Sequence, residues 1–297
     1  MKVLLLSILI FSSSILFSQE EPDPVKHLFS VRDLYYTSGI TLYGFENGTL
    51  PEFRKLAPTS SFLNRDLSNF SEKNGYRVSN GTMISAIAGF NFRNKRMNYY
   101  LPSPQVRIGF SYFSSVDITN TLTNNDIRRF DTIVYNGQSI YLDTVFNSRY
   151  KMEHHSKQLR LDLSAIFRTD RTKRWSFYGG IGFTLGGALN SYTNIQFHYT
   201  TYVDSADIAG HPLDKKAIKN GKDSISSESI TNKNGICYSV YFPMGMDFRV
   251  GKRSALLRHI HLFYEMRPGF YYLSIPELRH YRSPGMNFGF GMRIAID

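Results

Sequence analysis

The chain of 297 residues has a single cysteine, Cys237, so no intrachain disulfide can form and crosslinks are excluded as a source of stability. Beyond its first eighteen residues it also lacks any run of about 18 apolar residues, which excludes an ordinary transmembrane helix there. His259 and His261 stand two positions apart, but nothing nearby completes a metal-ligand spacing. We therefore expect no metal site and no cofactor.

The first eighteen residues have the pattern of a secretory signal. Met1-Lys2 form a short basic start, residues 3–17 form an apolar stretch, and Ser18 is a small residue suited to cleavage. The alternative is an uncleaved membrane anchor, but three serines interrupt the apolar stretch and it is short for a span. We expect a signal at residues 1–18 and one domain over residues 19–297.

Aromatic residues are abundant, with 20 Tyr and 23 Phe. They recur in segments where apolar and polar residues alternate, as in residues 286–296, where Met286, Phe288 and Phe290 alternate with Asn287 and Gly289. Alternation with period two predicts strands with one apolar face. Each segment has the roughly 9–11 residues that a tilted strand needs to cross a bilayer. The segments are 34–45, 82–92, 104–114, 158–168, 175–189, 236–250, 260–273 and 286–296.

The connections between these segments alternate in length. Residues 46–81, 115–157, 193–235 and 274–283 are polar loops, of which the first three are long, whereas residues 93–103, 169–174 and 251–259 are shorter. Outer-membrane barrels place long loops outside and short turns in the periplasm. We therefore predict an all-β fold, an antiparallel transmembrane β-barrel of about eight strands, located in the outer membrane with both termini periplasmic.

One long loop carries a hairpin signal of its own. Residues 131–135 and 138–143 flank Asn136-Gly137, a pair typical of a type I′ turn, so a hairpin is expected to extend the barrel wall above the membrane. The competing interpretation of the whole pattern is a soluble barrel or sandwich with its apolar faces turned inward. That arrangement would expose the glycine-rich polar faces, which glycine's poor strand propensity disfavours.

If the apolar faces meet lipid, eight charged residues point into the lumen. Isolated buried charges are costly, so we expect a packed ion-pair network in which the three acids are shared among the arginines. Eight strands enclose a space that side chains can fill, which disfavours an open porin; a gated or ligand-holding lumen is the alternative. The predicted lumen residues are Arg107, Arg160, Asp162, Asp247, Arg249, Glu265, Arg267 and Arg293.

Basic charge is concentrated in the three short connections. Each has a net charge of about +3 when Arg168 is included in the second, which accounts for most of the formal net charge of +11. Anionic lipid head groups are the simplest partner for this rim. An acidic periplasmic protein is the alternative, and nucleic acid is not expected in this compartment. The rim residues are Arg93, Lys95, Arg96, Arg171, Lys173, Arg174, Lys252, Arg253 and Arg258.

Two histidine groups are candidates for ester hydrolysis with histidine as base and serine as nucleophile. Residues 280–293 resemble the PagL-type lipid A deacylases, which carry a His-x-Ser pair before a terminal strand. Here Arg282 stands where that serine should be, and the serine comes one residue later. A one-residue shift in a strand turns a side chain to the other face. The candidates are His280, Ser283 and Glu277, and separately His154 and Ser156.

The chain after residue 18 resembles outer-membrane β-barrel proteins of the PorT-like and OmpA-like groups. The resemblance lies in the signal ending Phe17-Ser18-Gln19, in glycine- and aromatic-rich strands such as residues 178–183, and in the closing strand at residues 287–296. It implies a non-enzymatic binding, structural or assembly component, with some members accessory to type IX secretion. Expected partners are outer-membrane lipids and a larger outer-membrane or periplasmic protein complex. The alternative function is a lipid A-directed hydrolase.

Overall fold

A computed structural model describes residues 29–72, 76–92, 103–135, 138–169, 173–206, 223–251, 254 and 257–296. The predicted signal at residues 1–18 lies outside these ranges. The elements are β1 Phe29–Glu46, α2 Leu50–Leu56, β2 Ser71–Glu72, β3 Tyr76–Phe92, β4 Ser103–Tyr135, β5 Gln138–Arg168, β6 Trp175–Ala206, β7 Asp223–Asn232, β8 Ile236–Tyr241, β9 Met244–Arg249, β10 Ile260–Ser274 and β11 His280–Ala295.

The strands close into an antiparallel ring. The order runs β11-β1-β3-β4-β5-β6, continues through β8 and β9 to β10, and returns to β11. Strands β8 and β9 together occupy one position in the ring, because both lie between β6 and β10. The predicted strand at residues 236–250 is therefore interrupted at Phe242-Pro243, since proline has no N–H for the ladder. The prediction of an eight-stranded antiparallel barrel is confirmed.

Side chains alternate between the two sides of the ring in the sense expected for lipid outside. On β5, Leu159, Leu161 and Leu163 are each more than 40 % exposed, while Arg160 and Asp162 are buried. Apolar residues cover the exterior of the other ring strands as well, and the interior holds charged and polar residues together with a few buried apolar and aromatic side chains such as Met83, Ile87 and Phe263. This distribution excludes the soluble barrel or sandwich with inward apolar faces.

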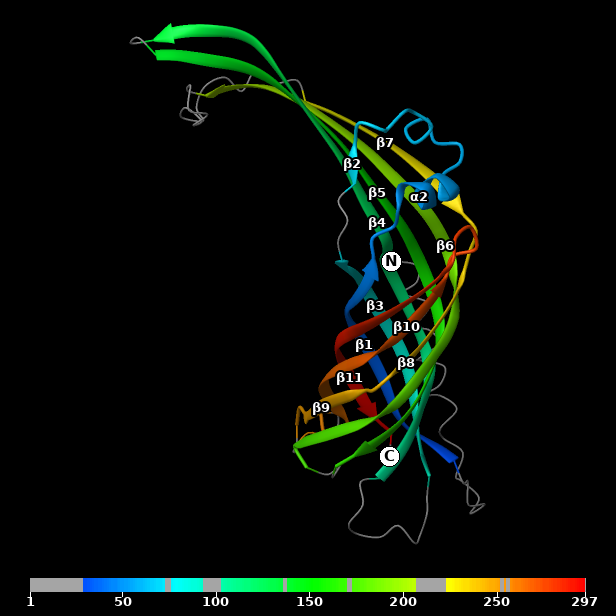
Figure 1. Cartoon of the computed structure of the whole chain (residues 1–297). Helices are drawn as coiled ribbons and strands as arrows, with labels where there is room; N and C mark the ends of the chain where they lie inside the picture. Colours follow the sequence, from blue (N-terminus) through cyan, green and yellow to red (C-terminus); the bar gives the residue numbers. More distant parts are fainter. Residues whose placement is uncertain are drawn as a thin grey trace, which may run out of the picture.

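The predicted loops at residues 115–157 and 193–235 are largely strand, which corrects the sequence prediction. Strands β4, β5 and β6 have 33, 31 and 32 residues and run far beyond the ring (Figure 1). The β4–β5 ladder continues to the pair Tyr135↔Gln138, so the predicted hairpin extension is confirmed, while its turn residues lie outside the described ranges. Beyond the ring, β4, β5 and β6 pair in this order and β7 pairs with the other edge of β6. We call this the projecting sheet; it consists of residues 116–135 of β4, 138–157 of β5, 190–206 of β6, and β7.

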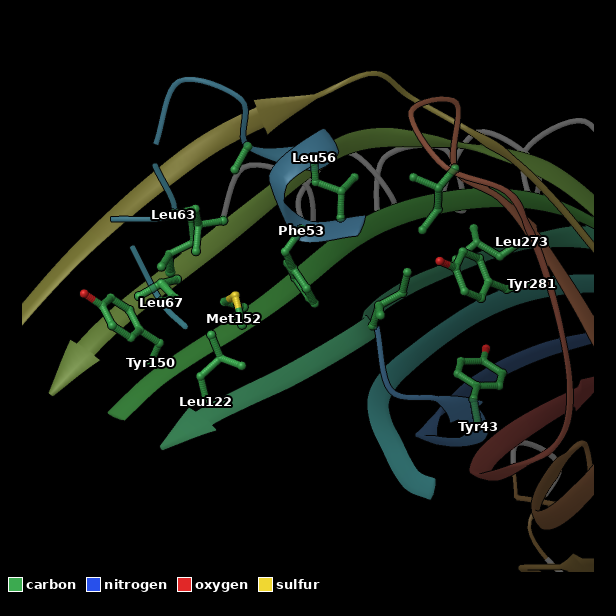
Figure 2. Close-up of a cluster of buried hydrophobic side chains, with 14 of the residues drawn as sticks. Tyr43, Phe53, Leu56, Leu63, Leu67, Leu122, Tyr150, Met152, Leu273 and Tyr281 are labelled. Carbon is green, nitrogen blue, oxygen red and sulfur yellow. The ribbon is translucent and has the colours of Figure 1, made fainter. Parts of the chain in front are cut away.

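The predicted loop at residues 46–81 also contains structure, including α2 and the short strand β2. Helix α2 begins after Thr49, whose backbone N donates to the Glu52 carboxylate at 2.9 Å, and Pro51 fits its first turn. Residues 47–72, the cap, lie against one face of the projecting sheet. Phe53, Leu56 and Leu63 of the cap are fully buried against it (Figure 2).

The face of the sheet beneath the cap is apolar, with Leu122, Met152 and Ile195 buried in the same cluster. This hydrophobic core extends beyond the ring, where it is built from sequence that reads as polar loop, and it continues into the ring through Tyr43, Cys237 and Tyr271. Among the described residues, no helix is long and apolar enough to cross a membrane.

Candidate functional site

The middle of the lumen holds a cluster built on Asp162 and Glu265. Arg107 Nη1 lies 2.6 Å from Glu265 Oε2, and Arg267 Nη1 lies 2.8 Å from Asp162 Oδ2, with Arg267 also paired to Glu265. Ser111 and Tyr241 donate further hydrogen bonds to the Asp162 carboxylate. All four charged side chains are buried from solvent, and they tie β4, β5 and β10 together across the ring.

A second cluster is built on Asp247, near the end of the ring opposite the projecting sheet. Arg293 Nε lies 2.7 Å and Arg168 Nη1 2.9 Å from Asp247 Oδ2, and His261 Nδ1 lies 2.6 Å from Oδ1. Arg293 also pairs with Asp33 at 2.7 Å. This cluster joins β1, β5, β9, β10 and β11, so it spans the seam where the barrel closes.

Two buried tyrosines connect the clusters. The guanidinium groups of Arg107 and Arg168 both lie over the rings of Tyr35 and Tyr178, at 4.8 to 6.0 Å from the ring centroids. The Tyr35 hydroxyl donates to Gln105 at 2.6 Å and accepts from Arg168 at 3.0 Å. Aromatic rings between cations stabilise both through cation–π contacts. The lumen is thus continuously packed between the Asp162 and Asp247 clusters.

Arg160 occupies the level between the Asp162 cluster and the cap. Its guanidinium lies 4.2 Å from the centroid of Phe113 and its Nε donates to Gln158 at 3.0 Å. Among the residues that the structure describes, no ion pair joins Arg160 to a carboxylate. Of the predicted lumen residues, Arg249 is the one that is only half-buried, and its backbone pairs with His261 at the end of β10.

Sequence reasoning missed three members of the ion pairs in this network: Asp33, Arg168 and His261. Asp33 precedes the first predicted strand, and the charge of Arg168 is counted with the second short connection although its side chain is buried in the lumen. His261 was considered only as a metal ligand. The alternation of side chains along a strand could have identified each of them. Asp33 lies on the same inward face as Tyr35 and Thr37, and His261 lies on the same inward face as Phe263 and Glu265.

The structure describes three of the predicted rim residues. Lys173, Arg174 and Arg258 are exposed at the end of the ring opposite the projecting sheet, and Arg174 lies 4.7 Å from the centroid of Phe248. The others lie outside the described residues: Arg93, Lys95, Arg96, Arg171, Lys252 and Arg253.

The candidate hydrolase residues do not converge. His280 is exposed and stacks on Tyr272, with ring centroids 5.3 Å apart, whereas Ser283 is buried on the other face of β11 and donates to the Pro284 carbonyl. Glu277 instead accepts a hydrogen bond from the Lys233 backbone at 2.7 Å.

His154 and Ser156 share a face of β5 but are buried, beside residues 233–235 and 273–276. His154 Nδ1 lies 3.2 Å from the Thr193 hydroxyl, and Ser156 accepts a hydrogen bond from Gln158. Burial, together with the neighbouring His155, lowers the pKa of His154 to about 4. With these partners, His154 and Ser156 form no base–nucleophile pair.

Outside the ring, aromatic side chains are in contact at two levels, as a row at one and as a pair at the other. One row crosses four strands through Phe183, Tyr238, Tyr272 and His280, with neighbouring centroids 6.5, 4.3 and 5.3 Å apart. At the other end Trp175 packs on Phe248 at 4.6 Å. On β6, Leu185 pairs with Tyr238 and lies ten residues from Trp175. Ten residues span about 33 Å along a strand and about 25 Å along the membrane normal when the strands are tilted by ~40°. Aromatic girdles flank an apolar band of about 25 Å in membrane barrels.

A closed antiparallel ring with charges inside, and an apolar band between two levels of aromatic contacts outside, defines a transmembrane β-barrel of the outer-membrane type. Neither the family models nor the curated proteins give a match to this chain.

Among solved structures, the chain is similar to Ail, the attachment invasion locus protein of Yersinia pestis, in complex with the heparin analogue sucrose octasulfate. The two are 10% identical, with 89% of this chain and 100% of that chain covered and a TM-score of 0.24. The outer membrane channel DcaP of Acinetobacter baumannii is 8% identical, with 93% and 100% covered and a TM-score of 0.15. The assignment to the class rests on the strand topology and the side-chain distribution.

A lumen packed in this way is not expected to conduct ions. Eight strands leave about enough room for side chains alone, and buried arginines and tyrosines occupy that room at successive levels. We expect the purified protein to give no stable unitary steps in planar bilayers, with detergent alone as the control. Reproducible open events of fixed amplitude would contradict the closed lumen.

Proposed function

We propose that this protein is a non-enzymatic outer-membrane barrel that holds the projecting sheet outside the cell as a binding platform for a protein partner, with both chain termini in the periplasm. The observation that carries the proposal is the unbroken continuation of β4, β5 and β6 beyond the ring. From Ser115 to Tyr135, β4 extends by about 65 Å at the rise of a β-strand.

The base of the projecting sheet is held rigidly by the cap. Ser60 Oγ donates to Glu228 of β7 at 2.6 Å, and Asn232 Nδ2 donates to the Leu56 carbonyl at 2.7 Å. Glu52 pairs with Arg279 beside β11 at 3.2 Å. Together with the buried apolar cluster, these contacts connect the sheet to the barrel rim on several sides. A rigid platform binds with less loss of conformational entropy than a flexible loop.

The placement of the two ends of the described chain, residues 29 and 296, supports the proposed orientation. Asp33 of β1 pairs with Ala295 of β11, and Ile296 N donates to the Arg32 carbonyl, so the ends of the described chain lie together. They lie at the end of the ring opposite the projecting sheet (Figure 1). Outer-membrane barrels keep their short turns periplasmic, which directs the projecting sheet to the exterior.

An accessory role in a secretion or surface complex fits this architecture. A closed lumen leaves no route for export through the barrel itself, whereas a long exposed sheet offers surface to a larger assembly. The resemblance to PorT-like barrels points to type IX secretion as the process to examine first.

Shortening the projecting sheet tests the proposal. Asn125 pairs with Asn147, so residues 126–146 can be replaced by Asn-Gly to close the hairpin in register. We expect this variant to insert and keep the heat-dependent mobility of a folded barrel, yet to lose a stoichiometric partner in a mild-detergent pull-down that the unmodified protein retains.

The matched control reverses the charges of Lys173, Arg174 and Arg258 at the opposite end. It should retain the partner if the sheet is the binding surface. Retention by the shortened variant, combined with loss on charge reversal, would overturn the proposal in favour of an acidic periplasmic partner at the rim.

A further inference from the structure

The outward face of β5 changes from apolar to ionisable residues where the strand leaves the ring. Leu163, Leu161 and Leu159 cover this face within the ring, and the next outward positions are occupied by ionisable residues. Because side chains alternate along a strand, these residues lie in one row on the same side. We call it the β5 row; it consists of Arg149, Lys151, Glu153, His155 and Lys157.

The β5 row is positively charged overall. Lys151 Nζ lies 2.8 Å and His155 Nε2 3.8 Å from the Glu153 carboxylate, and the interactions with these two side chains, His155 first, lower the pKa of Glu153 to about 2. Among the described residues, no ion pair is formed by Lys157 or Arg149. Beside the row, the His155 ring stacks on Tyr192 of β6, with centroids 4.9 Å apart and planes within 9°. The face therefore combines cations with a flat aromatic surface.

An apolar depression lies on the same wall, below the row. It has a volume of about 430 Å³ and is lined by apolar residues of four neighbouring strands, including Val106, Ala165, Phe183 and Val240. Leu163, on its edge, is six residues from Lys157, or about 20 Å along the strand and about 15 Å along the membrane normal at a tilt of ~40°. Phe183, which lines the depression, also belongs to the aromatic row that includes Tyr238 and Tyr272. The depression therefore lies in the outer-leaflet part of the apolar band, and Lys157 lies above that band.

We propose that this wall binds lipopolysaccharide, with its acyl chains in the depression and its phosphorylated sugars along the β5 row and the His155–Tyr192 surface. The height of the β5 row above the membrane favours lipopolysaccharide over a phospholipid. Lys151 is a further six residues above Lys157, about 15 Å along the normal, whereas a phospholipid headgroup layer adds only about 6 Å per side. A phosphorylated oligosaccharide headgroup reaches the upper cations, and a phospholipid does not.

This inference rests on the proposed orientation, since lipopolysaccharide occupies the outer leaflet. It is tested independently of the protein partner by native mass spectrometry of the purified protein in detergent. The probe is bis-phosphorylated lipid A carrying two core sugars, titrated against phosphatidylglycerol as the competing lipid.

Replacing both Lys151 and Lys157 with alanine is expected to weaken binding of the lipid A probe about tenfold, the effect of losing roughly one charge-assisted contact at a partly exposed site. The matched control replaces Lys55 and Lys233, two exposed lysines on the same side of the membrane, and should bind as the unmodified protein does. Replacing both lysines of the row with arginine should restore binding, which separates loss of charge from misfolding.

The depression is tested by Ala165→Phe, which fills it, with Ala86→Phe on the outward face of β3 as the control. Only the first should weaken binding. Equal affinity of the unmodified protein and the lysine variant for lipid A would overturn the proposal. So would phosphatidylglycerol binding that is as tight and as dependent on the same lysines. Loss of lipid binding with the partner retained would leave the proposed function intact.

Discussion

Replacing Glu265 with alanine is expected to destabilise the folded barrel by about 3–5 kcal/mol, because it leaves the buried guanidinium of Arg107 without a carboxylate. Glu265 accepts from both Arg107 and Arg267, and all three side chains are buried. Without Glu265, Arg107 has no other carboxylate among its ion pairs in the described residues. The free energy of unfolding in lipid vesicles, measured by urea titration with a folded-barrel gel assay, reports the change.

The control is Asp126→Ala, which removes a carboxylate from the exposed pair with Arg128 on the projecting sheet. Exposed pairs contribute about 0–1 kcal/mol, so this variant should unfold almost as the unmodified protein does. Equal effects of the two substitutions would show that the lumen network does not hold the barrel together.

Replacing Phe53 with alanine is expected to release the cap while leaving the barrel folded. Phe53 is fully buried between α2 and the projecting sheet (Figure 2). Truncation of a buried phenylalanine typically costs about 3–5 kcal/mol. The core between the cap and the projecting sheet is small, so this loss is a large part of the free energy that holds the cap in place. Limited proteolysis followed by mass spectrometry should show faster cleavage within residues 47–72.

The same substitution should not change the urea midpoint of the barrel, because the Asp162 and Asp247 clusters do not contact Phe53. Lys55→Ala, on the exposed side of α2, is the matched control and should leave the cleavage rate unchanged. Protection of residues 47–72 in the Phe53 variant would contradict a cap held mainly by this core.

The sequence predicted the ring but not the projecting sheet, and β5 shows why. Within the ring, the apolar residues of β5 are the odd-numbered Leu159, Leu161 and Leu163, which face lipid. Above it the apolar residues are the even-numbered Tyr150 and Met152, which face the cap. The apolar pattern thus changes sides where lipid gives way to water. Residues 115–157 therefore appeared to be a polar loop, since no apolar stripe continued in phase.

The lumen network was predictable because parity alone assigns inward positions once one face is known to be apolar. The alternation along one strand could not predict which residues pair across the ring. Arg107 and Glu265, for example, come together only when the barrel closes. Segment boundaries account for two of the omissions, because Asp33 lies just before the first predicted segment and Arg168 is the last residue of the fourth.

The closing seam has a consequence for assembly. Arg293 and Asp33 are paired although 260 positions separate them in the chain, and β1 pairs with β11 along its length. The first strand has no permanent neighbour on one side until the last strand is in place, so a growing or partly inserted chain exposes an open edge throughout. Such long-range pairing makes folding slow, and premature edge-to-edge association is the competing outcome. Pairing of the sixteen-residue strand β11 with β1 therefore closes the barrel and removes the open edge. Without β11 the other strands could not form a closed barrel.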